Sequence, residues 1–124
     1  IMKKLIFSLL MIGGVANASV MLECKSTTSV LQIQFDEGSE ISQPRNVQAT
    51  LITKIKVINL TSVDSENNSP GFFLRDEKTE RDFFVSRKGS KGAYSVMCTE
   101  PSGFGMMFPC DQDTNFTCKK VKNF

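Results

Sequence analysis

The stretch Val30-Leu31-Gln32-Ile33-Gln34-Phe35 decides the fold class of this chain, because apolar and polar residues alternate in it without a break. Such alternation places Leu31, Ile33 and Phe35 on one face of a β-strand and the two glutamines on the other. A strand with one apolar face belongs to a sheet that covers a core on that side only. The stretch therefore predicts a β domain in which one face of each strand meets solvent.

The same pattern recurs in short segments on both sides of this strand. Turn-forming residues separate the segments, and no sustained helical period occurs beyond the N-terminal stretch. The predicted strands are residues 20–25, 30–35, 46–60, 71–75, 82–86, 93–99 and 116–121. We predict an all-β, disulfide-bonded domain, a small antiparallel β-sandwich or barrel of six to eight short strands. The sequence does not choose between sandwich and barrel.

Two of these segments carry more specific expectations. In the longest run, residues 46–60, the predicted inward face is Val47, Ala49, Leu51, Ile55 and Val57, and residues 61–70 are expected to form a loop. Residues 71–75 and 82–86 are expected to form a hairpin around the charged turn 76–81. Each strand of that hairpin contains two adjacent phenylalanines, so each is expected to send one ring inward and one outward.

The N-terminal residues have the pattern of a secretory signal peptide. Lys3 and Lys4 follow Met2, residues 5–15 are uncharged and strongly apolar, and Ala16-Asn17-Ala18 has the small-x-small form of a cleavage site. The apolar run is shorter than the roughly 20 residues that a membrane-spanning helix needs. We predict a signal peptide over residues 1–18 and a single β domain over residues 19–124, periplasmic or secreted, with no transmembrane segment after cleavage.

Four cysteines lie in the predicted mature domain. In an exported domain an even number implies two disulfides, and four cysteines allow three connectivities. None of the cysteines shows the close CxxC-type spacing that zinc sites favour. We prefer the pairing Cys24–Cys98 with Cys110–Cys118, because Cys24 and Cys98 share the inward register of two predicted strands.

Composition excludes several classes of function. The chain has no histidine, which removes Ser-His and Cys-His nucleophilic sites and every His-ligated metal centre. Once Lys3 and Lys4 are removed with the signal peptide, basic and acidic residues are equal in number. A protein that binds nucleic acid normally has more basic than acidic residues, so no nucleic-acid partner is expected. No cofactor is expected either, and the oligomeric state is left open.

Paired carboxylates are the remaining generic catalytic option. Asp76, Glu77, Glu80 and Asp82 lie among basic residues in the predicted hairpin turn, where an exposed position would leave their acidity unperturbed. A carboxylate-dependent glycan hydrolase would require other acids, such as Glu23, Glu40 or Glu100, to meet this group at a concave site. We take the turn to be a solvated charged loop.

Asp111, Asp113 and Asn115 alternate like the first ligands of a calcium loop. The glycine and the glutamate that complete such a loop are replaced by Phe116 and Lys122. We predict no metal site, with these three residues as a weak calcium candidate.

The segment Gly103-Phe104-Gly105-Met106-Met107-Phe108-Pro109 is the main candidate for binding. Two glycines and a proline frame an apolar run between two cysteines. Because apolar residues are usually buried, the favoured interpretation is that this run covers one end of the core. If exposed, Phe104, Met106, Met107 and Phe108 would form a contact surface for a protein partner.

The segment Ser90-Lys91-Gly92-Ala93-Tyr94 is similar to the Gly-Ala and Tyr element of small periplasmic β-barrel inhibitors of c-type lysozymes. The spacing differs and no other motif matches. The resemblance implies a periplasmic inhibitor of a hydrolase. The leading interpretation of the chain is broader, an exported non-enzymatic β domain that acts by binding a protein or envelope partner.

Overall fold

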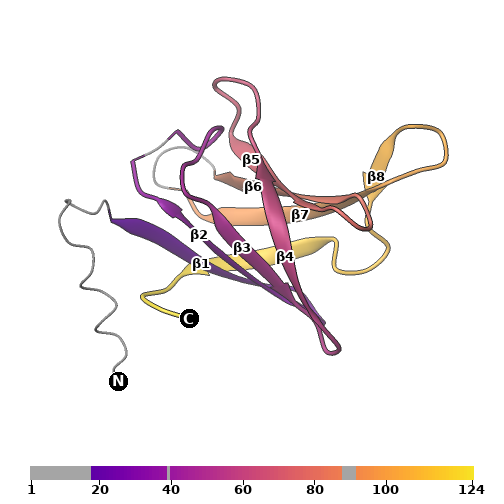
Figure 1. The fold of residues 1–124 in the computed structure, drawn as a ribbon, viewed down its shortest axis with the longest axis horizontal. Helices are drawn as coiled ribbons and strands as arrows, with labels where there is room; N and C mark the ends of the chain where they lie inside the picture. The colour runs from indigo at the N-terminus through magenta and orange to yellow at the C-terminus, as the bar shows by residue number, and fades with distance from the viewer. Residues whose placement is uncertain (1–17, 39, 88–91) are drawn as a thin grey trace.

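The computed structural model describes residues 18–38, 40–87 and 92–124. Within these residues the chain forms nine β-strands joined by turns and loops (Figure 1). They are β1 (Ser19–Lys25), β2 (Val30–Asp36), β3 (Gln48–Ile52), β4 (Val57–Val63), β5 (Gly71–Asp76), β6 (Arg81–Arg87), β7 (Tyr94–Pro101), β8 (Met107–Pro109) and β9 (Asn115–Lys120).

Eight of these strands close into an antiparallel barrel, and β8 is an additional strand outside it. Strands β1 to β7 follow one another around the barrel in chain order, each paired with the next. Strand β9 then returns between β7 and β1 and closes the ring. The predicted all-β, disulfide-bonded domain is confirmed, and its architecture is the barrel rather than the sandwich.

The core fills the barrel with the inward face of each strand. Leu31 and Ile33 are fully buried and Phe35 nearly so, as the alternation in this segment predicts. Aromatic rings join strands across the interior, since the Phe35 and Phe72 ring centroids lie 5.6 Å apart and those of Phe83 and Phe116 lie 5.9 Å apart, edge to face. Such edge-to-face pairs add to the stabilisation from burial.

The predicted hairpin is strands β5 and β6. Phe72 and Phe83 point inward and are fully buried, while Phe73 and Phe84 lie on the outer surface, where they are partly covered. The two outer rings are cross-strand neighbours with centroids 4.8 Å apart. The expectation of one ring inward and one outward on each strand is therefore confirmed.

The prediction for residues 46–60 is wrong after Ile52. A turn at residues 53–56 divides the run into β3 and β4, and the side chain of Thr53 accepts hydrogen bonds from the backbone N–H groups of Ile55 and Lys56. Ile55 stands 87% exposed in this turn, and Val57 is also exposed. The turn shifts the inward positions from odd to even numbers, because Ile58 and Leu60 now pack against the core.

Residues 61–63 are likewise part of β4 rather than of a loop. Thr61, Ser62 and Val63 pair with Arg75, Leu74 and Phe73 of β5.

The predicted disulfide connectivity is also wrong. The bridges are Cys24–Cys118 and Cys98–Cys110. Cys24 and Cys98 both point inward and are fully buried, as predicted. Strand β9, however, lies between β1 and β7, so the cross-strand neighbour of Cys24 is Cys118. Two disulfides fit a protein that folds in an oxidising, extracytoplasmic compartment.

The predicted signal peptide falls almost entirely outside the described residues and stays a prediction. Among the described residues, no helix has the length and the apolar character needed to span a bilayer.

Candidate functional site

Strand β8 projects from the barrel as part of a hairpin with the end of β7 (Figure 1). One edge of β7 has two successive partners. Ser95–Met97 pair with β9, and Thr99–Pro101 pair with β8. Cys98 lies at the point where the partner changes. Thr99 still pairs with Asp82 of β6; beyond it the chain leaves the barrel wall, turns at residues 102–106 and returns to begin β9 at Asn115.

The apolar side chains of this projecting hairpin are exposed. Phe104 is 88% exposed, and Met106, Met107 and Phe108 are 58%, 43% and 48% exposed. Successive residues of a strand point to opposite faces, and β8 is exposed along its whole length. Neither face of β8 is therefore covered, and the interpretation that this run covers one end of the core is wrong.

The hairpin turn is held in shape without burial. The backbone N–H of Ser102 donates to the carbonyl oxygen of Met106 at 2.7 Å. The hydroxyl oxygen of Ser102 accepts from the N–H groups of Phe104 and Met106. Gly105 takes a φ of 78°, a conformation that a residue without a side chain adopts at little cost. The exposed side chains thus sit on an ordered turn.

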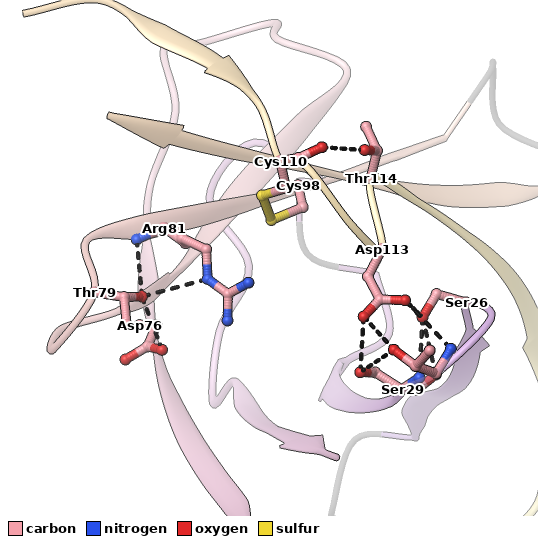
Figure 2. Close-up of a disulfide and its surroundings, with 10 residues drawn as sticks. Ser26, Ser29, Asp76, Thr79, Arg81, Cys98, Cys110, Asp113 and Thr114 are labelled. Atoms are coloured by element: carbon pink, nitrogen blue, oxygen red, sulfur yellow. Dashed lines mark hydrogen bonds between the residues drawn. A yellow bond between two sulfur atoms is a disulfide. The ribbon is translucent and has the colours of Figure 1, made fainter. Parts of the chain in front are cut away.

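The base of the hairpin is fixed by the second disulfide (Figure 2). Cys98 and Cys110 also share a backbone hydrogen bond of 3.0 Å between the Cys110 N–H and the Cys98 carbonyl. Thr114 donates its hydroxyl to the Cys110 carbonyl, and its own carbonyl accepts from the Cys98 N–H at 2.6 Å. The two ends of the excursion are therefore tied together at the barrel wall.

Asp113 attaches the returning segment to the turn between β1 and β2 (Figure 2). Its carboxylate accepts hydrogen bonds from the hydroxyls of Ser26, Thr28 and Ser29, at 2.6 Å in the case of Ser26, and one from the backbone N–H of Thr28. Partial burial acts to raise the pKa of Asp113, but these hydrogen bonds to the charged form outweigh it and hold the pKa below its usual value. The residue keeps a φ of 56°, which this set of contacts stabilises.

This geometry bears on the weak calcium candidate. The Asp113 oxygens already accept hydrogen bonds from the neighbouring turn, and Asp111 and Asn115 are exposed. Across residues 18–38, 40–87 and 92–124, no group of three or more His, Cys, Asp or Glu side chains is arranged to hold a metal ion.

A second apolar feature lies on the outside of the barrel wall. Val63, Phe73, Phe84 and Met97 are successive cross-strand neighbours on β4, β5, β6 and β7. We call these four residues the outer stripe. Val63 and Met97 are exposed and the two rings are partly covered. Met107 pairs with Pro101, so by strand alternation it lies on the same face of the sheet as Met97.

The acidic hairpin turn differs from the expected exposed loop, because two of its four carboxylates are buried. Asp76 accepts hydrogen bonds from the backbone N–H of Lys78 and the hydroxyl of Thr79. Asp82 is paired with Arg75, whose Nε and Nη2 donate to its two oxygens at 2.8 and 3.1 Å. The hydrogen bond and charge of Asp82 raise the pKa of Arg75. These carboxylates stabilise the turn and the β5–β6 pair, while Glu77 and Glu80 are exposed.

The other acids do not join this group. The pocket that Asp76 and Glu77 line is otherwise formed by residues 56–59, Lys78 and Thr79, and Glu23, Glu40 and Glu100 do not line it. Glu23 instead lies 4.0 Å from Lys119 on the neighbouring strand. In the described structure, Glu23, Glu40 and Glu100 therefore do not meet the acidic turn in this pocket.

Comparison with protein families, with curated proteins and with solved structures finds no match for this chain. The fold and the side chains themselves are thus the basis for a functional proposal. The similarity to periplasmic lysozyme inhibitors rests on residues 90–94, of which Ser90 and Lys91 lie outside the described residues.

Sequence reasoning identified the projecting hairpin as a candidate but not the outer stripe as a unit. Met97 could be recognised as outward-facing, since it stands between the inward residues Val96 and Cys98, whereas Val63 lies in the segment that was expected to form a loop. Their alignment depends on the register of β4 to β7, which no single segment encodes. The role of Phe104, Met106, Met107 and Phe108 in binding stays a prediction.

Proposed function

We propose that this protein is an exported, non-enzymatic β-barrel that binds a protein partner through the projecting hairpin. The observation that carries the proposal is the exposure of Phe104, Met106, Met107 and Phe108 on an ordered turn. Soluble proteins rarely leave contiguous large apolar side chains in water without a binding role. Aromatic and methionine side chains are also enriched at the centre of protein interfaces.

The covalent and hydrogen-bonded base of the hairpin favours this role. A binding loop that is already ordered loses less conformational entropy when it meets its partner. Here the Cys98–Cys110 bridge, the Ser102 turn and the Asp113 contacts fix the loop before any partner arrives. The outer stripe adds exposed apolar side chains on the same face of the sheet as Met107.

The binding proposal is tested by capture of partners from envelope extract and culture fluid. The protein is produced with its own N-terminal segment in an exporting bacterial host and purified with both disulfides formed. A Phe104→Ser/Met107→Ser variant removes the apolar tip. Phe124→Ser is the matched control, because Phe124 is also an exposed aromatic but lies at the C-terminal end of the chain.

A specific partner should be retained by the Phe124→Ser control and lost from the double variant. Burying a Phe or Met side chain stabilises by about 1.5–3 kcal/mol, so affinity should fall by at least about 100-fold, or roughly 2.7 kcal/mol. Circular dichroism establishes that both variants are folded. Equal retention of the partner by the two variants would refute the proposed site.

Export is tested separately. We propose cleavage before Ser19, supported by the signal-peptide pattern of residues 1–18 and by the two disulfides. N-terminal sequencing of the protein recovered from periplasm or medium should begin at Ser19. Recovery of the uncut chain from the cytoplasm with free thiols would contradict this proposal.

A more specific form of the proposal is inhibition of a hydrolase such as a c-type lysozyme. A loop that projects from a folded domain and is closed by a disulfide, as the hairpin is by Cys98–Cys110, is suited to enter the concave active site of an enzyme. The measurement is cell-wall lysis by c-type lysozyme with an equimolar amount of the protein or of its Phe104→Ser/Met107→Ser variant. Full lysozyme activity in the presence of the unaltered protein would reject the inhibitor form and leave the capture experiment to decide the broader one.

A further inference from the structure

Strand β4 has two different neighbours along its length, and one of them is short. It pairs with β3 from Val57 to Leu60, but with β5 only from Thr61 to Val63. Among the described residues, no strand pairs with the other edge of residues 57–60. The first half of β4 therefore has a free strand edge in the wall of the barrel.

The backbone groups of Val57 and Asn59 face this free edge. Thr53 donates its N–H to the Lys56 carbonyl, so these two residues form a hydrogen-bonded pair at the end of the β3–β4 hairpin. Because such pairs alternate along an antiparallel ladder, Ile58 directs its N–H and C=O groups to β3. Val57 and Asn59 direct theirs to the opposite edge, where the described part of the chain supplies no backbone hydrogen-bond partner.

A pocket of about 310 Å³ lies beside this edge. Residues 56–59 form one side of it, and residues 76–79, from the end of β5 and the turn that follows, form the other. Ile58 packs against the core, yet it also lines the pocket and is only partly buried. The volume is within the roughly 300–1,000 Å³ of ligand sites. The pocket thus combines an apolar surface with free backbone donors and acceptors.

The free edge lacks the features that usually prevent strand pairing. Natural proteins protect exposed edges with charged side chains, proline or β-bulges. The stretch Val57-Ile58-Asn59-Leu60 contains neither a charged residue nor a proline, and its register with β3 is continuous. Val57 is 66% exposed. An edge of this kind is complementary to the backbone of another extended segment.

We propose that this edge binds an extended peptide segment of a partner protein, which adds as a short strand antiparallel to β4, in the direction of β5. The peptide residues opposite Val57 and Asn59 exchange backbone hydrogen bonds with them. The peptide residue between these two lies beside Ile58 on the inward face and is apolar, while its two neighbours point to solvent. The site shares no residue with the projecting hairpin and does not depend on the function proposed for it.

The first test is hydrogen exchange in the isotope-labelled full protein, exported with both disulfides formed and followed by NMR. The amides of Val57 and Asn59 should exchange at least about 100-fold faster than those of Ile58 and Leu60, which donate to β3. Equal protection of all four amides would overturn the proposal. Protection of Val57 and Asn59 that rises with protein concentration would also overturn it, because the occupant of the edge would then be a second copy of the chain.

The second test is titration with the peptide acetyl-Thr-Val-Thr-Val-Thr-amide, since the backbone rather than a particular side chain supplies most of the binding. We expect saturable shifts of the Val57 and Asn59 amide resonances and slower exchange of both amides. A methyl group on the central threonine nitrogen removes a donor that faces β4 and should weaken binding at least about tenfold. The matched control carries the methyl group on a valine nitrogen, which faces away from β4, and should bind within about twofold of the parent peptide. Absence of saturation, or equal binding of the two methylated peptides, overturns the proposal.

Variants of the protein provide the reciprocal test. Asn59→Pro removes the N–H at the free edge and leaves the hydrogen bonds to β3 in place, and proline is tolerated where a strand N–H faces solvent. Asn59→Ala is the matched control, because it keeps the N–H. The first should weaken peptide binding at least about tenfold and the second by less than about twofold. Equal weakening by the two would contradict the proposal, and if Asn59→Pro does not fold, the methylated peptides still decide it.

Discussion

The substitution Gly71→Ala tests the close approach of β5 and β6 in the barrel wall. Gly71 is the first residue of β5 and pairs with Ser86. A Cβ atom at this position would lie 2.8 Å from the carbonyl carbon of Val85 and 2.9 Å from the Cα of Ser86, and closer still to the Val85 carbonyl oxygen. All three are backbone atoms, so no side-chain rotation relieves the contact.

The expected cost follows from this geometry. Overpacking of a filled interior costs about 1–3 kcal/mol, and here the upper value applies because the two strands must move apart. Each strand hydrogen bond lost in that movement adds about 1 kcal/mol. The smaller conformational freedom of alanine in the unfolded chain returns about 0.4–1 kcal/mol. We therefore expect the free energy of unfolding to fall by about 3 kcal/mol, out of the roughly 5–15 kcal/mol typical of a domain.

The assay is urea unfolding followed by circular dichroism, with Gly103→Ala as the matched control. A Cβ atom on Gly103 would have no neighbour within 4 Å. The control should therefore leave the free energy of unfolding unchanged or raise it by up to about 1 kcal/mol. If Gly71→Ala lowers it by less than about 0.5 kcal/mol, the register of β5 against β6 and the argument built on it are incorrect.

Two further predictions concern the covalent and polar ties of the barrel. Replacing Cys24 and Cys118 by alanine should lower the free energy of unfolding by about 4.5 kcal/mol, and the Cys98→Ala/Cys110→Ala variant should lower it by about 3 kcal/mol. The difference follows from the sequence separations of the two pairs, 94 and 12. If urea unfolding shows that loss of the second pair costs more, this order is contradicted. Asp113→Ala should cost about 1–2 kcal/mol at pH 7 through lost hydrogen bonds to a charged group. Because folding lowers the Asp113 pKa, this contribution is complete above the unfolded pKa of about 3.9 and is lost as the pH falls through the folded pKa. The difference from the unaltered protein should therefore shrink below about pH 4, and a constant difference down to pH 2 would exclude the mechanism.

The alternation of residue types was sufficient to predict the strands and their inward faces wherever it continued without a turn. Leu31, Ile33 and Phe35 lie where the pattern places them, and each of β5 and β6 sends one phenylalanine ring inward and one outward, as predicted. The pattern failed at Ile55, because the residues of the turn at 53–56 resemble strand residues. A turn of that length changes which positions face inward, and it depends on hydrogen bonds from Thr53 that composition does not reveal.

The disulfide connectivity failed for a different reason. The inward register of Cys24 and Cys98 was correct, but the sequence does not state which strands are neighbours. Only the return of β9 between β1 and β7 brings Cys118 beside Cys24. The Asp113 contacts with the turn at residues 26–29 likewise join segments more than 80 residues apart, and no local signal points to them.

The position of β9 also determines when this protein can finish folding. Strand β9 is synthesised after the eight other described strands, yet it lies inside the ring and closes it, and it carries Cys118 of the Cys24–Cys118 disulfide. Until it is in place, β1 and β7 each expose a row of unpaired backbone groups that can pair with another chain. The barrel can therefore close only after β9 has been synthesised. The contacts that form last, between β9 and β1, join residues that are far apart in the sequence. A chain that stops a few residues short of Asn115 would have two unpaired strand edges, on β1 and β7, and a free thiol at Cys24. We expect such a chain to be degraded by proteolysis or to aggregate rather than to accumulate as a smaller barrel.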